Sequence, residues 1–218
     1  MSADNSTRFT RKGLATRERI VDATAGLMFE HGVENTSIDD VRAVCGVSGS
    51  QMSHYFDGKR DLTRRVIAKR RSEVTAFHTQ PRLHGLDSLA ALRAWADACI
   101  ADVDRVYRRG GCIFGSLVGE LIEGDAEMHA DLAAGYDDWI ELFRLGLCSM
   151  QRRGELIEAA DPRHLAASLV IAHQGGAMMT FVTGDPEPLR AELNAAVDYV
   201  CSFAVAAPRR TRARRGRG

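Results

Sequence analysis

Apolar positions recur at helical spacing along almost the whole chain. Between Ile20 and Met28, apolar side chains return at intervals of three and four residues, which predicts an amphipathic helix over residues 16–30. The pair His31-Gly32 predicts its end, because glycine adopts the left-handed backbone that closes many helices. No run of alternating apolar and polar residues, the pattern of a half-buried β-strand, is bounded by turn residues. The pattern therefore predicts an all-α chain of eight to ten helices without an internal repeat.

Two more helix starts follow at short range. Thr36 stands three residues before Asp39, which predicts a start there. Ser48 stands three residues before Gln51, the spacing of a capping box, in which the two side chains satisfy each other's free backbone amides. Only a tight turn fits in between, at Cys45-Gly46-Val47. The sequence thus predicts two short helices whose crossing angle is locked by Val41, Val44, Val47 and Met52.

Prolines and glycines divide the rest of the chain into longer helices. Pro81 and Gly85 mark one corner, and the pair Gly110-Gly111 marks a second break. Asp161 is followed by proline, which is favoured in the first helical turn. We expect helices over residues 59–79, from Asp87 or Ser88 to 107, over 112–123, over 126–153 after a cap at Asp125, over 161–183 and over 185–206.

Charge is unevenly distributed although the chain is neutral overall. Residues 1–71 carry 13 Lys and Arg against 9 Asp and Glu, residues 72–207 carry 10 against 20, and residues 208–218 carry six Arg and no acid. A basic first third favours contact with a polyanion there, although charge also varies along chains without functional meaning. We expect the last residues to be disordered, either as a phosphate-contacting arm or as a solubilising tail.

The short helix pair has the features of a helix-turn-helix. Such a unit needs a glycine at its turn and small polar residues at the start of the second helix, so that the backbone can approach the floor of the major groove. Ser48-Gly49-Ser50-Gln51 provides that start. An ordered set of motifs over about 50 residues surrounds the pair: Phe29–Gly32, Thr36–Val41, Gly46–Ser48, and Tyr55-Phe56 followed by Lys59.

This set resembles the DNA-binding domain of the tetracycline repressor (TetR) family. The resemblance implies a homodimeric, cytoplasmic transcriptional regulator, a repressor that a small-molecule inducer releases from palindromic operator DNA. An activator or an architectural DNA binder stays open as an alternative. So does an all-helical carrier or enzyme in which the helix-turn-helix is only a packing unit.

The resemblance also implies roles for single side chains. Gln51 is the best candidate for a base contact, because its amide can bond adenine through two hydrogen bonds. Tyr55 and Lys59 would bind the flanking DNA backbone. The expected DNA-binding residues are Arg17, Thr36, Ser37, Arg42, Ser48, Gly49, Ser50, Gln51, Ser53, His54, Tyr55 and Lys59. Ser48 and Gln51 could instead serve only as helix caps, and Lys59 could simply be solvated.

Two positions depart from the family pattern. Ser53 stands where the family usually carries a phosphate-binding tyrosine, so that His54 or Tyr55 would have to supply the contact. Arg42 stands where the family usually has a small buried residue. Its side chain must therefore extend to solvent or reach DNA.

In the resembled family, the last two long helices pair with those of a second copy. The expected dimer residues follow helical spacing: Leu165, Leu169, Ala172, Gly176, Met179, Leu193, Val197, Val200 and Ala204. A two-fold axis makes such an interface self-complementary. The same positions could instead fill the subunit's own core.

The acidic part of the chain also suggests a pocket for a small, mainly apolar inducer. Large, soft or aromatic side chains and a few polar groups could converge there. The expected lining is Trp95, Tyr107, Phe114, Ser116, Met128, Trp139, Phe143, His173, Gln174, Met178 and Phe181. Residues of these types at helical spacing are also common in ordinary cores.

Catalytic chemistry finds no support in the sequence. The acidic cluster around Glu120 and Glu127 lacks the paired Glu-x-x-His of a di-iron bundle, and Cys and His do not cluster at zinc spacing. We therefore expect no enzyme, metal or cofactor. The five scattered cysteines fit a reducing cytoplasm, and no apolar run is long enough to span a membrane.

These patterns together predict four segments. We expect a flexible arm over residues 1–15, a helix-turn-helix DNA-binding domain over 16–62, a ligand-binding and dimerisation domain over 63–206, and an Arg-rich tail over 207–218.

Overall fold

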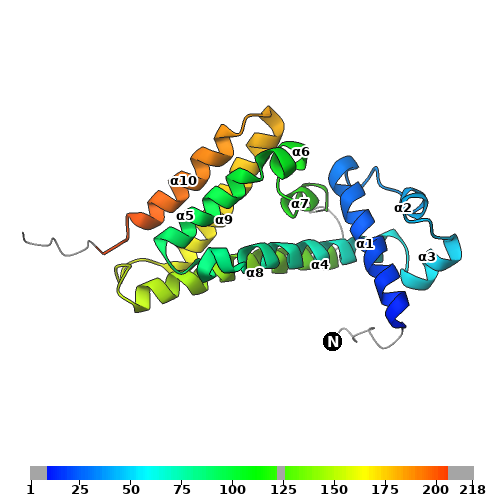
Figure 1. Ribbon diagram of the computed structural model, residues 1–218, viewed down its shortest axis with the longest axis horizontal. Helices are drawn as coiled ribbons and strands as arrows, with labels where there is room; N and C mark the ends of the chain where they lie inside the picture. The colour runs from blue at the N-terminus through cyan, green and yellow to red at the C-terminus, as the bar shows by residue number, and fades with distance from the viewer. Residues whose placement is uncertain (1–8, 122–125, 206–218) are drawn as a thin grey trace, which may run out of the picture.

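The computed structural model describes residues 9–121 and 126–205, and within these residues it is helical without a strand (Figure 1). The all-α prediction of eight to ten helices is confirmed for this part of the chain. The helices are α1 (Arg11–His31), α2 (Ile38–Cys45), α3 (Gly49–Tyr55), α4 (Lys59–His78), α5 (Leu89–Ala101), α6 (Arg108–Gly110), α7 (Gly115–Leu121), α8 (Ala126–Arg152), α9 (Pro162–Thr183) and α10 (Glu187–Cys201). A 3₁₀-helix, η2 (Pro81–Leu86), follows α4, and a π-helical turn, η3 (Val103–Tyr107), precedes α6.

The helices form two lobes joined by α4. Figure 1 shows α1, α2 and α3 at one end, with α4 running from them along α8 into the larger lobe of α5 to α10. Ion pairs hold α4 parallel to α8 at three successive levels: Arg60–Glu127, Arg64–Asp131 and Arg71–Asp138. A movement of α8 would therefore be transmitted through α4 to the small lobe.

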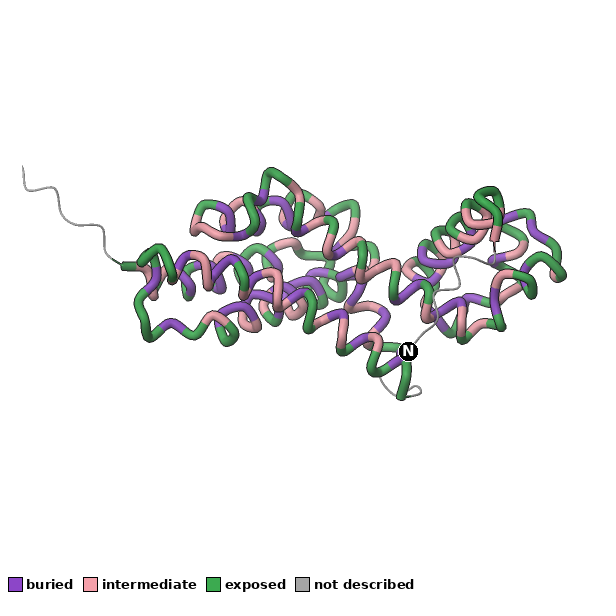
Figure 2. Tube along the Cα trace, turned by 90° about the horizontal axis from the view of Figure 1, so that it is seen from below, coloured by how far each residue is buried: buried purple, intermediate pink, exposed green. Residues whose placement is uncertain are grey.

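Each lobe has its own apolar core, and buried positions run along the inner faces of the helices in both (Figure 2). The small core contains Ile20, Val41, Cys45, Val47, Met52, Phe56 and Leu62. The large core is built from α4, α5, α8, α9 and α10 around Trp95, Trp139 and Phe143. Val44 was expected to lock the two short helices, and this was wrong: its side chain is 63% exposed, and Cys45 packs inside instead.

Local caps decide where the short helices begin. The capping box at Ser48 and Gln51 is confirmed, with the Gln51 amide 3.2 Å from the Ser48 hydroxyl and the Ser48 amide 2.9 Å from the Gln51 side chain. The start predicted at Thr36 is off by one residue. Ser37 caps α2 through a box with Asp40, because the same spacing occurs at both positions.

Several predicted boundaries also shift. Helix α1 begins at Arg11, capped by Thr10, so the last residues of the expected arm are helical. Ser88 caps α5, which ends at Ala101 before the π-helical turn rather than at residue 107. The expected helix over 112–123 begins only at Gly115, as α7, and its last two residues lie outside the described residues. Helix α10 ends at Cys201 instead of 206. The predicted cap at Asp125 and the Arg-rich tail lie outside the described residues.

Helix α9 is the one described helix that is long and apolar enough to cross a membrane. Its inner face packs against α8 and α10, and 44% of its most apolar 18-residue stretch is buried inside the protein. Apolar side chains on its outer face remain exposed, chiefly at Ile171, Met178 and Val182. This composition is also that of a core helix with a second apolar face.

Candidate DNA-binding surface, dimer face and ligand cavities

The turn between α2 and α3 is fixed by two features. Gly46 adopts a left-handed conformation with φ of 61°, which glycine reaches without steric cost. The Arg19 guanidinium, from α1, donates a 2.7 Å hydrogen bond to the Cys45 carbonyl just before that turn. These contacts set the direction in which α3 leaves the lobe.

Helix α3 presents a polar outer face. Ser48, Ser50 and Gln51 are exposed at its start, and Ser53 and His54 are exposed one turn later. The Gln51 Oε1 atom accepts the Ser48 amide, so that only its NH₂ group is free to donate outward. Gln51 thus serves as a cap, and a two-bond contact with adenine would require its Oε1 atom to accept a second hydrogen bond beside that of the Ser48 amide. Ser53 donates to the Gly49 carbonyl at 3.1 Å.

Two residues that were expected to bind DNA phosphates form hydrogen bonds within the protein. Thr36 is 2% exposed and donates a 2.7 Å bond to the Gly32 carbonyl, so its expected DNA contact is wrong. Ser37 is exposed, but its hydroxyl donates to the Asp40 carboxylate at 2.6 Å. These bonds to Ser37 hold the pKa of Asp40 below its ordinary value. Ser37 therefore acts mainly as the cap of α2.

Arg17 and Tyr55 pack against aromatic rings near the start of α1. The Arg17 guanidinium lies over the rings of Phe9 and Phe56, and burial lowers its pKa. Phe9 also contacts the rings of Tyr55 and His54, with centroid distances of 5.4 Å to both. Phe9 was missed from the sequence because it lies in the expected arm. Tyr55 is thereby half-buried in packing, while His54 stays exposed next to it.

Arg42 and Lys59 also have partners within the protein. Arg42 extends outward, as one of the two alternatives predicted, and pairs with Asp39 at 2.6 Å. Its guanidinium lies beside Gly49, at the first turn of α3. Lys59 donates to the Glu34 carbonyl at 3.2 Å, which ties the start of α4 to the α1–α2 turn. Arg42 and Lys59 therefore flank α3 while bound to their own lobe.

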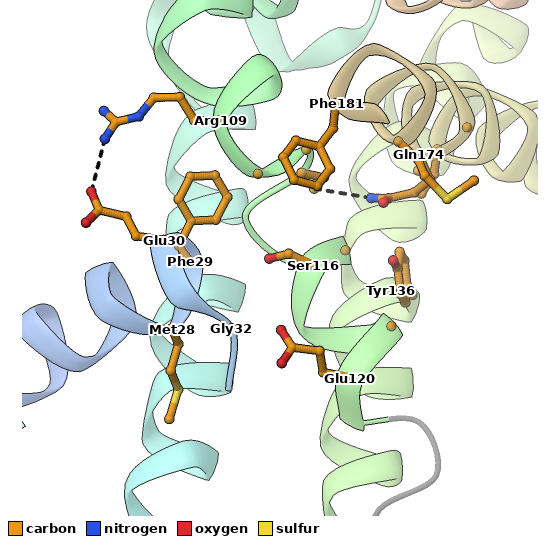
Figure 3. A pocket seen from close by; sticks show the side chains of 18 of the residues that line it. Met28, Phe29, Glu30, Gly32, Arg109, Ser116, Glu120, Tyr136, Gln174 and Phe181 are labelled. Carbon is orange, nitrogen blue, oxygen red and sulfur yellow. Dashed lines mark hydrogen bonds and ion pairs between the residues drawn. The ribbon is translucent and has the colours of Figure 1, made fainter. Parts of the chain in front are cut away.

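A cavity of about 870 Å³ lies where the two lobes meet. We call it the junction cavity; the end of α1, the segment from Arg109 to Glu120, and parts of α8 and α9 line it (Figure 3). Of the predicted lining residues, the structure brings together Ser116, Gln174, Met178 and Phe181. The sequence did not indicate Phe29 or Glu120, because their proximity depends on contact between distant segments.

Three contacts across the junction cavity join the lobes. Figure 3 shows Glu120 on α7 pointing toward Gly32, and its carboxylate accepts the Val33 amide at 2.6 Å. Arg109 pairs with Glu30 at 3.0 Å. The Phe29 ring lies so close to Gly110 that an added Cβ there would stand 2.6 Å from it. Occupation of this cavity would therefore act on the contacts between the lobes.

A second cavity, of about 330 Å³, lies deeper in the large lobe. The predicted residues Tyr107, Trp139 and His173 line it, and we call it the His173 cavity. Next to it, His78 Nε2 accepts the indole N–H groups of both Trp95 and Trp139, at 3.0 and 2.9 Å. Burial lowers the pKa of His78 to about 4 and that of His173 to about 3.

The other expected lining residues line neither cavity. Trp95, Phe114 and Phe143 are at most 1% exposed, and Met128 is buried as well. They are core residues, which was the alternative interpretation of their helical spacing. Of the acidic cluster, Glu120 bonds the Val33 amide and Glu127 pairs with Arg60 and Arg64. Within the described residues, no group of three potential metal ligands comes together.

Most of the expected dimer residues face the subunit's own core. Leu165, Leu169, Leu193, Val197 and Val200 are at most 1% exposed, so they have no surface left for a partner. Gly176 allows α10 to approach, since an added Cβ would lie 2.8 Å from the Leu189 Cα atom. Ala204 lies beyond α10 in a bridge to Leu156. For the buried residues the assignment to the interface was wrong; Ala172 and Ala204 are half-buried and Met179 is exposed, so that for these three it stays a prediction.

A row of exposed apolar side chains runs along the outside of α9, next to the buried residues Leu165 and Leu169. Ile171, Met178 and Val182 are 68%, 60% and 73% exposed and follow helical spacing. Gly175 lies in the same row, with open space around it, and Ile171, Gly175 and Met178 also line the junction cavity, so the row borders that cavity. On α10, which packs beside α9, Tyr199 is also exposed. A second copy could cover this outer row.

Comparison with known proteins agrees with this architecture. Residues 20–66 match the family of bacterial regulatory proteins of the tetR type, and residues 88–196, half of the chain, match the tetracyclin repressor-like C-terminal domain. The chain belongs to the TetR family. As a TetR-family member it is a DNA-binding transcriptional regulator, with the helix-turn-helix in α2 and α3.

Individual relatives of this TetR-family chain are distant. An uncharacterised HTH-type transcriptional regulator of Lactococcus lactis is 28% identical over 78% of this chain and 85% of its own. A TetR regulator from Chloroflexus aurantiacus has a TM-score of 0.78 at 23% identity, covering 91% of this chain and all of its own. The regulatory protein TetR from Rhodobacter sphaeroides has a TM-score of 0.75 at 22% identity, covering 87% of this chain and 99% of its own. At these identities the structures support the fold alone.

Proposed function

We propose that this TetR-family chain is a cytoplasmic repressor that binds a palindromic operator as a homodimer. A small, mainly apolar ligand in the junction cavity releases it from the DNA. The observation that carries the proposal is the position of that cavity, whose walls include two polar contacts between the DNA-binding lobe and the rest of the chain, Glu120 with Val33 and Arg109 with Glu30.

Operator recognition is assigned to the exposed face of α3. In a helix-turn-helix, the start of the second helix enters the major groove, and dimer symmetry sets two half-sites about one helical turn apart. Ser48, Ser50 and the free amide group of Gln51 lie on that face, with His54 one turn further on. Arg42 and Lys59 flank it and could bind phosphates by exchanging their internal partners.

Dimerisation is assigned to the outer row of α9. This row offers the exposed apolar surface that most of the expected dimer residues lack, and Gly175 permits close approach of a second backbone. A contiguous exposed apolar surface of this kind is typical of a protein interface. We divide the subunit accordingly into a DNA-binding domain up to the start of α4 and a ligand-binding and dimerisation domain beyond it.

Release follows from coupling between the cavity and the lobes. A ligand that fits only when α7 moves away from the end of α1 would break the bond between Glu120 and Val33. The two recognition helices of the dimer would then lose their fixed spacing. Because binding free energies are linked, the ligand would weaken operator binding by the factor by which operator weakens ligand binding.

The DNA-binding part of this proposal is tested with an operator selected by the full chain from random-sequence DNA. Gln51→Glu retains the capping box, since glutamate serves equally well at that position, but places a negative charge on the groove-facing surface. We expect operator affinity to fall at least tenfold while thermal stability is kept. The control Ser72→Glu adds the same charge on α4 and should leave affinity unchanged. Equal affinity of Gln51→Glu and the wild type would refute the assignment.

A further inference from the structure

The start of α3 offers few free hydrogen-bonding groups of its own for reading bases. The Ser48 and Ser50 hydroxyls bond each other at 2.9 Å, and the Gln51 Oε1 atom accepts the Ser48 amide. Gly49 has no side chain, and one turn later Ser53 donates to the Gly49 carbonyl. Apart from the amide group of Gln51, the first turn of α3 therefore lacks a long side chain that is free to reach a base edge.

The side chain of Arg42, from α2, fills the space that Gly49 leaves open. A Cβ atom added at Gly49 would lie 3.6 Å from the Arg42 Cζ atom, and 3.8 and 3.7 Å from Nη1 and Nη2. The guanidinium therefore lies where a side chain of residue 49 would extend. In a helix-turn-helix, the first residues of the second helix approach the base edges in the major groove. Arg42 thus takes the place of a long side chain at the start of α3.

The guanidinium of Arg42 is held by a single partner. Its Nη1 atom donates to the Asp39 carboxylate at 2.6 Å, which is the one hydrogen bond of this side chain within the part of the chain that the structure describes. Its Nε atom is buried there without a partner. A hollow of about 220 Å³, which Gly49 and Ser53 also line, lies beside it. Because a guanidinium carries several N–H donors in a fixed plane, donors remain for a bound molecule.

The Asp39 carboxylate favours a base edge over a phosphate as the partner of Arg42. It is 82% exposed, and its ion pair with Arg42 leaves the two side chains without net charge. The carboxylate would repel a phosphate, whereas a neutral base edge carries no such penalty. Guanine presents two acceptors, O6 and N7, in the major groove, and a guanidinium can bond both at once. The geometry therefore fits a guanine.

We propose that Arg42 is a specificity-determining residue that bonds O6 and N7 of one guanine in each half-site of the operator. Asp39 orients the guanidinium, and Gly49 leaves room for it beside α3. This assignment rests on the proposed function, because it requires that α3 enters the major groove. It gives Arg42 a narrower role than a phosphate contact. Since Arg42 departs from the family pattern at its position, the contact is particular to this chain.

The test compares the operators that the wild-type full chain and Arg42→Ala select from random-sequence DNA. We expect the wild-type operators to share one guanine per half-site that the Arg42→Ala operators lack, while the other positions agree. Replacing that G·C pair by A·T in both half-sites should weaken wild-type binding about tenfold or more, and binding of Arg42→Ala less than about twofold. Lys59→Ala is the matched control: a phosphate contact carries no sequence information, so this variant should bind both operators more weakly by the same factor.

A modified base tests the contact with the wild-type protein alone, so the result does not depend on the folding of a variant. The base 7-deazaguanine keeps the pairing and the O6 acceptor of guanine but lacks the acceptor at N7. At the selected guanine it should weaken wild-type binding about tenfold, the effect of one lost hydrogen bond to a charged group, and leave Arg42→Ala unaffected. The same base outside the half-sites should change nothing. Arg42→Lys keeps the charge but not the planar pair of donors, and should discriminate less well than the wild type.

Three results would overturn the assignment of Arg42. They are an equal loss of affinity for both operators in Arg42→Ala, which indicates a phosphate contact, the same guanine in the operators that Arg42→Ala selects, and undiminished wild-type binding to the 7-deazaguanine operator. In each of them the wild type still selects an operator, so the proposed function stands. Failure of the wild type to select any operator would instead overturn both.

Discussion

The contact between Glu120 and the α1–α2 turn leads to a quantitative prediction about coupling. Glu120→Ala removes the carboxylate that accepts the Val33 amide at 2.6 Å and approaches the Glu34 amide at 3.4 Å. Val33 is 3% exposed, so its N–H group would be left buried without an acceptor. Such a loss costs about 1–3 kcal/mol, and the bonds of a charged acceptor lie at the upper end. A cost of about 2 kcal/mol corresponds to roughly a 30-fold change in an equilibrium constant.

If this contact holds the lobes in the DNA-binding arrangement, its loss should weaken operator binding by about tenfold or more. The assay is fluorescence anisotropy with the selected operator, alongside thermal unfolding of the same samples. Glu120→Gln keeps a neutral acceptor and should show a smaller loss. Arg109→Ala removes an exposed ion pair with Glu30, which contributes at most about 1 kcal/mol, and should change affinity less than fivefold. If Glu120→Ala loses stability while its operator affinity stays within twofold of the wild type, the contact is only structural and the coupling argument fails.

Three other outcomes can be measured on the free protein. Because the folded pKa values of His78 and His173, about 4 and about 3, lie below the ordinary 6.5, the unfolded chain takes up protons first as pH falls. The free energy of unfolding that these two histidines contribute should be fully present above pH 6.5. It should fall between about pH 6 and 4 by about 1.4 kcal/mol per histidine per pH unit, and a pH-independent midpoint of urea unfolding would contradict this. Gly146→Ala places a Cβ 2.3 Å from the Leu86 carbonyl oxygen and should destabilise by about 3 kcal/mol, whereas Gly119→Ala, with open space around it, should stabilise slightly by chemical denaturation; equal effects would be against the packing argument. Val182→Asp on the outer row of α9 should give monomers in size-exclusion chromatography with light scattering, unlike Ile157→Asp, and a dimer that survives the change would place the interface elsewhere.

Local signals in the sequence predicted the parts of the fold that local forces control. The box at Ser48 and Gln51 involves residues three apart, so its presence could be inferred directly. The cap of α2 was predicted one residue too early, at Thr36 instead of Ser37, because both residues precede an aspartate by three positions. Only the bond from Thr36 to the Gly32 carbonyl shows which of them turns inward.

Faces of helices and cavities depend on contacts that periodicity does not contain. Helix α9 is apolar on two faces, so its spacing could not show which face meets α10 and which remains outside. The junction cavity depends on contact between Glu120 and Val33, which lie 87 residues apart. His173 and Gln174 were predicted as ligand contacts together, yet they line different cavities because adjacent helical residues point in different directions.

Hydroxyl-radical footprinting of the selected operator tests the central claim most directly. A dimer that reads DNA through two copies of α3 should protect two related half-sites on one face of the duplex, with centres about one helical turn apart. Gln51→Glu should abolish both protections together. A single protected segment without internal symmetry, or protection that persists in Gln51→Glu, would contradict the account.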